Sequence, residues 1–180
     1  MKTAQTTLGR RLSLLFLSIA LGAFCAGFAQ AQQGDGTPPC SGEKYRLFDF
    51  WVGDWDVFDT EGTSVGRNRI ESILGGCAIQ ENWTGGGGSI GHSFNIYDAA
   101  NDKWHQTWVD NRGLLLELDG GFRDGKMVLE GKRPGPDGKL VHHRITWQAT
   151  GEGHVKQRWE TTTDGSNWNA IFEGVYKKRS

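Results

Sequence analysis

The stretch from residue 140 to residue 160, LVHHRITWQATGEGHVKQRWE, decides the fold class of this chain. Its two halves alternate between apolar and polar residues with a period of two, and a Gly-Glu-Gly turn at 151–153 separates them. Successive side chains of a strand point to opposite faces, so the pattern predicts two half-buried strands joined by a short turn. The inward faces are predicted to be Val141, His143, Ile145 and Trp147 on the first strand, and Val155, Gln157 and Trp159 on the second.

The same alternation recurs along the chain from Trp51 onward, in runs of about six to ten residues. Turn dipeptides such as Asp124-Gly125 and Asp164-Gly165 separate these runs, and loops this short join only antiparallel neighbours. A closed barrel leaves no unpaired strand edge, and the regular strand spacing favours it over a Greek-key sandwich. We therefore predict an all-β fold, an antiparallel up-and-down barrel of roughly ten strands, with a short helical turn within residues 43–50.

Composition narrows the possible partners. The 180 residues include 20 Lys and Arg against 21 Asp and Glu, so the chain has no strong field for nucleic acid or an anionic membrane. Aromatic residues make up 11%, with 8 Trp, which is far too many for a disordered chain. These values predict one compact domain that does not bind nucleic acid, as a monomer or a small homo-oligomer.

The first 31 residues have the pattern of a signal peptide. Lys2, Arg10 and Arg11 precede an apolar run at 12–28, and Ala29-Gln30-Ala31 provides a small-x-small cleavage pattern. A transmembrane anchor is the alternative, but the run is short for a bilayer span and no charges follow it directly. We predict cleavage near Ala31-Gln32, and a periplasmic or secreted mature protein without a membrane span.

Cleavage would leave a mobile lead-in at 32–42 and a barrel domain at 43–180. The leader contains three of the 20 basic residues and no acidic residue, so 17 basic and 21 acidic residues give the mature chain a net charge of −4. Of the 3 cysteines, Cys40 and Cys77 remain. In an oxidising compartment we predict a disulfide between them, because they lack the C-x-x-C spacing of a metal or redox pair. Two free buried thiols are the alternative.

The remaining strands also have predicted inward faces. In the stretch 65–73 neither face is clearly apolar, so Arg69 is left without an assigned direction. For the other strands the more apolar set is placed inside: Ile79, Glu81 and Trp83; Ile90, His92, Phe94 and Ile96; Trp104, Gln106 and Trp108; Met127 and Leu129.

This interior is mostly aromatic and aliphatic, with a few polar groups. Aromatic walls with a small number of convergent polar groups are typical of a small-molecule pocket, and a barrel of about ten strands has room for one. We predict a binding site for a small hydrophobic or amphipathic molecule, formed by Trp55, Trp83, Gln106, Trp108, His143, Trp147, Gln157 and Trp159.

Glu81 and His92 are the candidate catalytic residues. A hairpin across Gly85–Gly88 that pairs Trp83 with Ile90 would place Glu81 opposite His92, as a shielded carboxylate–imidazole pair. Such a pair can act as acid and base, which makes an isomerase, cyclase or hydrolase the alternative to a binding protein. The same pair can also be a satisfied structural contact, and a structural envelope protein with a filled barrel is the third interpretation.

No metal site is predicted, because the adjacent residues His142 and His143 point to opposite faces and no cluster has ligand spacing. No cofactor is expected either. Axial ligation of a haem iron by His143 or His92 is the alternative, because a single imidazole suffices for it.

The stretch 48–55, FDFWVGDW, resembles a known family. Gly53-Asp54-Trp55 resembles the G-x-W signature of lipocalins and related calycins. Together with 98–113 (DAANDKWHQTWVDNRG), Gly120-Gly121-Phe122 and the run from Gln157 to Trp168, it resembles a bacterial secreted family of unknown function over residues 43–178. The resemblance implies a lipocalin-like barrel and brings no established reaction or ligand.

Haem-binding barrels of the nitrobindin type share the early G-x-W motif. Their haem histidine lies near the end of the chain, whereas the last histidine of this chain is His154, which is predicted to face outward. This departure argues against a haem role.

Overall fold

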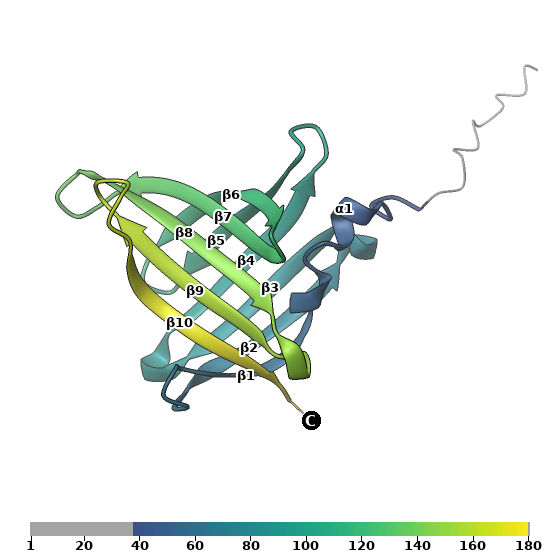
Figure 1. Ribbon diagram of the computed structural model, residues 1–180, viewed down its shortest axis with the longest axis horizontal. Coiled ribbons are helices and arrows are strands. Elements are labelled where there is room, and N and C mark those ends of the chain that lie inside the picture. The colour runs from purple at the N-terminus through teal and green to yellow at the C-terminus, as the bar shows by residue number, and fades with distance from the viewer. Residues whose placement is uncertain (1–37, 180) are drawn as a thin grey trace, which may run out of the picture. The chain divides into compact units, whose positions relative to one another are not determined.

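The computed structural model describes residues 38–179, and its ten strands form a closed barrel (Figure 1). Each strand pairs antiparallel with the next along the chain, and β1 pairs with β10 to close the barrel. The predicted up-and-down barrel is confirmed. The predicted leader and its cleavage site at Ala31-Gln32 lie outside the described residues. Within those residues no helix has the length and apolar character needed to cross a membrane.

The elements follow one another with short connections. A short helix α1 (Glu43–Arg46) and a 3-10 turn η1 (Asp49–Trp51) precede the strands, as predicted for residues 43–50. Further 3-10 turns connect some strands, namely η2 (Leu74–Gly76), η3 (Gly86–Gly88) and η4 (Gly151–Gly153). The strands are β1 (Gly53–Phe58), β2 (Ser64–Ile73), β3 (Ala78–Gly85), β4 (Ile90–Asp98), β5 (Lys103–Asp110), β6 (Leu115–Arg123), β7 (Lys126–Pro134), β8 (Leu140–Ala149), β9 (Val155–Thr162) and β10 (Asn169–Lys178).

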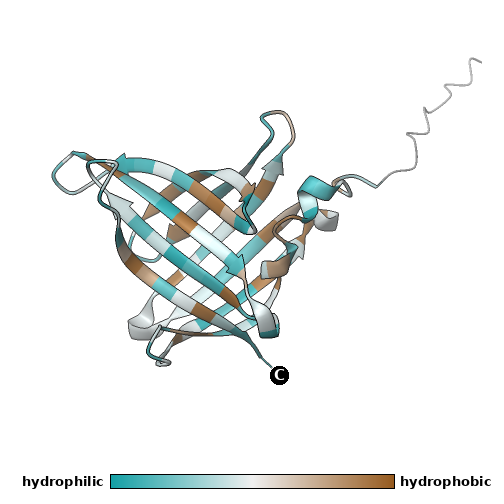
Figure 2. Ribbon diagram, viewed as in Figure 1, coloured by the Kyte–Doolittle hydropathy of each residue, from teal (hydrophilic) through white to brown (hydrophobic). Residues whose placement is uncertain are grey.

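The alternating sequence pattern explains which faces the strands bury. Figure 2 shows apolar and polar residues alternating along the strands, and the apolar set faces the interior on most of them. The predicted inward faces of β3, β5, β7, β8 and β9 are confirmed, because every predicted member is buried or half-buried. Ala78, Val128 and Glu160, which belong to the opposite faces, are also buried. Arg69, left unassigned, faces outward, with its Nη2 atom 3.2 Å from Oε2 of Glu71.

Strand β4 is the exception, and its predicted inward face was wrong. The interior receives Ser93 and Asn95, both fully buried, while Phe94 is 54% exposed. Thr84 rather than Trp83 pairs with Ile90, so the register differs by one residue from the predicted hairpin. A one-residue shift turns every side chain to the other face, and a loop of four glycines specifies register poorly. The predicted interior set Ile90, His92, Phe94 and Ile96 therefore lies on the outer face.

The segment that contains α1 and η1 covers one end of the barrel. Phe48 and Trp51 are fully buried there, with ring centroids 4.9 Å apart. Phe48 also contacts Trp104 and Trp147, at centroid distances of 5.6 and 5.2 Å. Trp55 of the G-x-W motif donates a hydrogen bond of 2.9 Å from Nε1 to the carbonyl oxygen of Trp51. This end of the barrel is therefore filled with aromatic side chains.

Three contacts attach the covering segment to the barrel. The Sγ atoms of Cys40 and Cys77 lie at disulfide distance, 2.06 Å, which supports the predicted pairing. The Arg46 guanidinium donates to the carbonyl oxygen of Gly76 in η2. Trp104 donates from Nε1 to the carbonyl oxygen of Lys44, at 3.2 Å. The segment is thus held at two neighbouring places on the same rim.

Candidate functional site

A cavity of about 330 Å³ occupies the barrel interior on the side away from α1 and η1. It reaches the β3–β4 and β5–β6 loops, where Ser89 and Arg112 border it. Its volume lies at the lower end of the range of about 300–1,000 Å³ that is typical of ligand pockets. The lining residues are Glu81, Trp83, Ser89, Gln106, Trp108, Asp110, Arg112, Leu114, Leu116, Ile145, Trp147, Gln157, Trp159, Ile171, Phe172 and Tyr176.

Glycines on neighbouring strands position two of the aromatic walls. A Cβ atom on Gly91 would fall 2.2 Å from Cζ2 of Trp108, and one on Gly66 would fall 2.7 Å from Cη2 of Trp83. The indole rings therefore lie directly against backbone that has no side chain. Phe172 meets Trp83 edge-on, at a centroid distance of 6.0 Å. This packing fixes the ring orientations without filling the cavity.

A group of hydrogen-bonded polar side chains, here called the floor, lies at the inner end of the cavity. Its central residue is Glu81 of β3, which is 5% exposed. Its Oε1 accepts a hydrogen bond from Nδ2 of Asn68 on β2, and its Oε2 accepts one from Oγ of Ser93 on β4, both at 2.7 Å. Ser93 in turn accepts from Nδ2 of Asn95 at 2.9 Å and from Nε2 of Gln106 at 3.4 Å. Donors from three strands therefore act, directly or through Ser93, on one carboxyl group.

Burial raises the pKa of Glu81 from 4.5 to about 7, and the hydrogen bonds from Asn68 and Ser93 oppose part of this effect. Burial dominates because removing a carboxylate from water disfavours its charged form. Burial also raises the pKa of Tyr176, with a further contribution from the charge of Glu81, so that hydroxyl is neutral over the physiological range. Glu81 is therefore the group of the floor that changes charge near neutral pH.

Some polar atoms of the cavity lack a partner within residues 38–179. Tyr176 donates its hydroxyl proton to Oε1 of Gln157, which leaves Nε2 of Gln157 without an acceptor in that range. The buried Nε1 atoms of Trp108 and Trp147 also lack a partner there. These three donors are therefore available to a molecule bound in the cavity.

A scan against protein-family models and a search of curated proteins both find no match to this chain. The resemblance to a secreted lipocalin-like family stays a prediction, and the closed barrel is compatible with that fold.

Most of the residues predicted to bind a ligand lie around this cavity. Trp55 does not line it, because that ring packs at the closed end near Tyr176, at a centroid distance of 6.2 Å. His143 does not line it either; its Nδ1 accepts a hydrogen bond of 3.1 Å from Nε1 of Trp159, which positions that ring. The predicted residues that do line the cavity are Trp83, Gln106, Trp108, Trp147, Gln157 and Trp159.

The predicted Glu81–His92 pair is wrong. Glu81 pairs across the hairpin with Ser93, whereas His92 pairs with Asn82 and faces outward. Nδ1 of His92 lies 3.2 Å from Oδ1 of Asn82 on the outer surface. His92 can therefore serve neither as an interior acid or base nor as an interior haem ligand.

Sequence reasoning missed the residues that complete the floor. Asn68 lies in the stretch whose faces the pattern did not separate, and Ser93 and Asn95 belong to the strand placed in the wrong register. Phe172 and Tyr176 were not assigned, although their even spacing along β10 already places them on one face.

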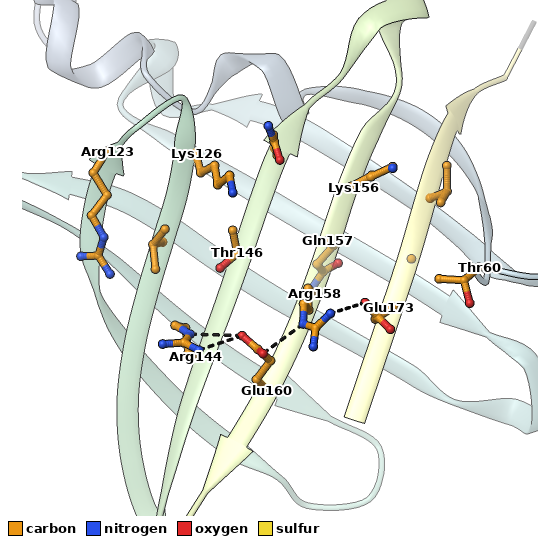
Figure 3. A pocket seen from close by; sticks show the side chains of 14 residues that line it. Thr60, Arg123, Lys126, Arg144, Thr146, Lys156, Gln157, Arg158, Glu160 and Glu173 are labelled. Atoms are coloured by element: carbon orange, nitrogen blue, oxygen red, sulfur yellow. Dashed lines mark hydrogen bonds and ion pairs between the residues drawn. The ribbon is translucent and has the colours of Figure 1, made fainter. Parts of the chain in front are cut away.

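A second hollow, of about 670 Å³, lies on the outer face over β7 to β10 (Figure 3). Glu160 accepts from Nη2 of Arg144 at 3.1 Å and from Nε of Arg158 at 3.0 Å, and Arg158 continues to Glu173 at 2.8 Å. Two of its arginines, Arg144 and Arg158, are thus already paired with its glutamates. This hollow is a solvent-exposed ionic surface and lacks the aromatic walls of the interior cavity.

Proposed function

We propose that this protein binds a small, partly apolar molecule inside its barrel. The observation that carries the proposal is the interior cavity of about 330 Å³, with Trp83, Trp108 and Trp159 in its walls and the buried carboxyl group of Glu81 in its floor. Apolar walls supply most of the affinity of such a site, and a few fixed polar groups orient the ligand.

A filled structural barrel is disfavoured by how the interior is divided. The closed end is packed with Phe48 and Trp51, whereas the opposite half is hollow. A buried carboxyl such as Glu81 costs free energy that an apolar side chain would avoid, so a purely structural barrel gains nothing from it.

Catalysis is a second candidate function, and the observation that favours it is the pKa of Glu81 near 7. A general acid or base works best when its pKa lies near the operating pH. However, both carboxyl oxygens of Glu81 already accept hydrogen bonds, and the predicted partner His92 lies outside the barrel. These contacts favour a role in holding a ligand over a role in an isomerase, cyclase or hydrolase.

We further propose that the mature protein is secreted or periplasmic. The leader pattern of residues 1–31 and the Cys40–Cys77 pair, which suits an oxidising compartment, support this location. Native mass spectrometry of the protein taken from its own compartment, without reductant, tests it. A chain that begins at Gln32 and lacks two protons is the expected mass; an uncleaved, reduced chain would contradict it.

Replacing Trp108 with Ala is expected to weaken binding of small aromatic probes at least tenfold, or about 1.4 kcal/mol, because one cavity wall is lost. Isothermal titration of benzyl alcohol and related compounds into the mature protein measures the change. Trp168→Ala is the matched control, since Trp168 lies outside the barrel, where the Arg144 guanidinium stacks 3.9 Å from its ring centroid. Unchanged affinity in both Trp108→Ala and Gln157→Ala would show that the cavity is not the site.

A further inference from the structure

The direction of the hydrogen bonds in the floor indicates which form of Glu81 they are built for. Asn68 and Ser93 each donate to a different oxygen of the carboxyl group. An ionised carboxylate accepts at both oxygens, whereas a protonated one must donate from one of them. Asn95 and Gln106 both donate to Ser93, which directs the Ser93 proton toward Glu81. The network is therefore arranged to stabilise a negative charge.

That charge has no positive partner among the described residues. None of the ion pairs within residues 38–179 includes Glu81. The strands around it contribute neutral groups: Asn68 from β2, Ser93 from β4, Gln106 from β5, Gln157 from β9 and Tyr176 from β10.

Only the loop side of the cavity has other charges, and these have opposite signs. Asp110 and Arg112 line it there, so together they add no net charge. A buried carboxylate without a counter-ion is costly, and the cost falls when a cation binds beside it. Within residues 38–179 no cation pairs with Glu81, so a positively charged ligand beside it would supply the charge that this part of the chain does not.

The walls of the same cavity suit a cation. The faces of Trp, Tyr and Phe rings carry partial negative charge, and sets of such rings recognise ammonium groups. Trp83, Trp108 and Trp159 line the cavity together with Phe172 and Tyr176. A cation in this space would meet ring faces as well as the carboxylate.

We propose that the molecule bound in the barrel is a small ammonium compound, with its positive charge beside Glu81 and its apolar part between the tryptophans. This assignment rests on the proposed binding function and adds the chemical class of the ligand. The cavity volume of about 330 Å³ limits the ligand to a small amine. A carboxylate or phosphate ligand would instead be repelled by Glu81.

Three aromatic probes that differ in charge test the charge preference. Benzyltrimethylammonium is a permanent cation, benzyl alcohol is neutral and benzoate is an anion, and each is titrated calorimetrically into the mature protein at pH 8. We expect the cation to bind at least tenfold more tightly than benzyl alcohol, and benzoate to bind more weakly than both.

The pH dependence of cation binding identifies the carboxylate. Glu81 changes from mostly protonated at pH 6 to mostly ionised at pH 8, so the affinity for benzyltrimethylammonium is expected to rise about tenfold over that interval. Benzyl alcohol has no charge to pair and is expected to bind equally at both values. This comparison uses the wild-type protein and does not depend on any variant folding.

Glu81→Gln is expected to remove both the cation preference and the pH dependence. Glu117→Gln is the matched control, because Glu117 lies exposed on the outer face of β6, and it is expected to retain both. An affinity for benzyltrimethylammonium that is the same at pH 6 and pH 8, and the same in Glu81→Gln as in the wild type, would overturn the proposal. Equal or tighter binding of benzyl alcohol or benzoate would overturn it and leave the cavity as a binding site. Failure of all three probes to bind would overturn the proposed function as well.

Discussion

Glu81→Gln is expected to abolish a fall of about 3 kcal/mol in the unfolding free energy that the wild-type protein undergoes as the pH rises from 4.5 to 8. The origin of this fall is the single carboxyl group in the polar floor. Its pKa rises from 4.5 to about 7 because folding removes it from water. Each pKa unit of difference between the folded and unfolded states corresponds to about 1.4 kcal/mol.

The sign follows from which state binds the proton more tightly. The folded state does, so the contribution of Glu81 to stability is complete below pH 4.5 and is lost as the pH rises through 7. Asp164 behaves in the opposite way. Backbone and side-chain donors of Asn167 and Ser166 hold the pKa of Asp164 well below 3.8, so its contribution is lost only as the pH falls into the acid range. The two effects therefore occur in separate pH windows.

Urea unfolding at pH 4.5, 6, 7 and 8 measures the effect, with no ligand present. The difference between wild type and Glu81→Gln isolates the contribution of Glu81, because the other titrating groups are common to both proteins. Glu117→Gln is expected to follow the wild-type curve. Parallel curves for wild type and Glu81→Gln would show that the carboxyl group has the same proton affinity in both states.

The same proton equilibrium links stability to binding. At pH 8 an ionised Glu81 destabilises the empty barrel, and a bound ammonium compound would reduce that cost. Any ligand that binds the folded state alone stabilises the protein, and a cation should do so more strongly at pH 8 than at pH 6. The ionised form of Glu81 is unfavourable in the ligand-free protein, and a binding site for a cation would explain why the carboxyl group is there.

The barrel was predictable because the sequence pattern that indicates it lies within each strand and recurs from strand to strand. Each strand shows the period of two within its own residues, and the turn dipeptides between strands leave only antiparallel pairing. The walls of the site, such as Trp83, Trp108 and Trp159, followed from the same alternation. Closure of one end by Phe48 and Trp51 did not follow, because apolar residues in a short helical segment show no direction.

The floor of the site was less predictable because its contacts join distant parts of the chain. Asn68 reaches the hydroxyl of Tyr176, which is 108 residues away, and no local pattern signals such a contact. In β4 the local pattern predicted the wrong inward face. Its more apolar set, including Phe94, faces outward because Ser93 and Asn95 meet the hydrogen-bonding needs of the buried Glu81 and Gln106. Satisfying buried polar groups outweighed the burial of apolar side chains on this strand.

Replacing Phe48 with Ala is expected to lower the unfolding free energy by about 3–5 kcal/mol, the range for truncating a fully buried Phe. Phe48 is 0% exposed and contacts Trp51, Trp104 and Trp147, so its removal leaves a void under three large rings. Trp147 also lines the ligand cavity, and the void therefore lies next to the site. The barrel wall offers little room for these rings to collapse inward.

Phe94→Ala is the matched control, since it removes the same atoms from the outer face of β4. It is expected to cost less than about 1 kcal/mol, because Phe94 is 54% exposed. Urea unfolding of both variants at pH 5, where Glu81 is protonated, compares them without the pH effect described above. Similar losses in the two variants would mean that Phe94 is buried, and hence that β4 has the register in which Glu81 faces His92. A large loss confined to Phe48→Ala would instead support an outward Phe94, and with it the inward Ser93 on which the Glu81 network and the cation site depend.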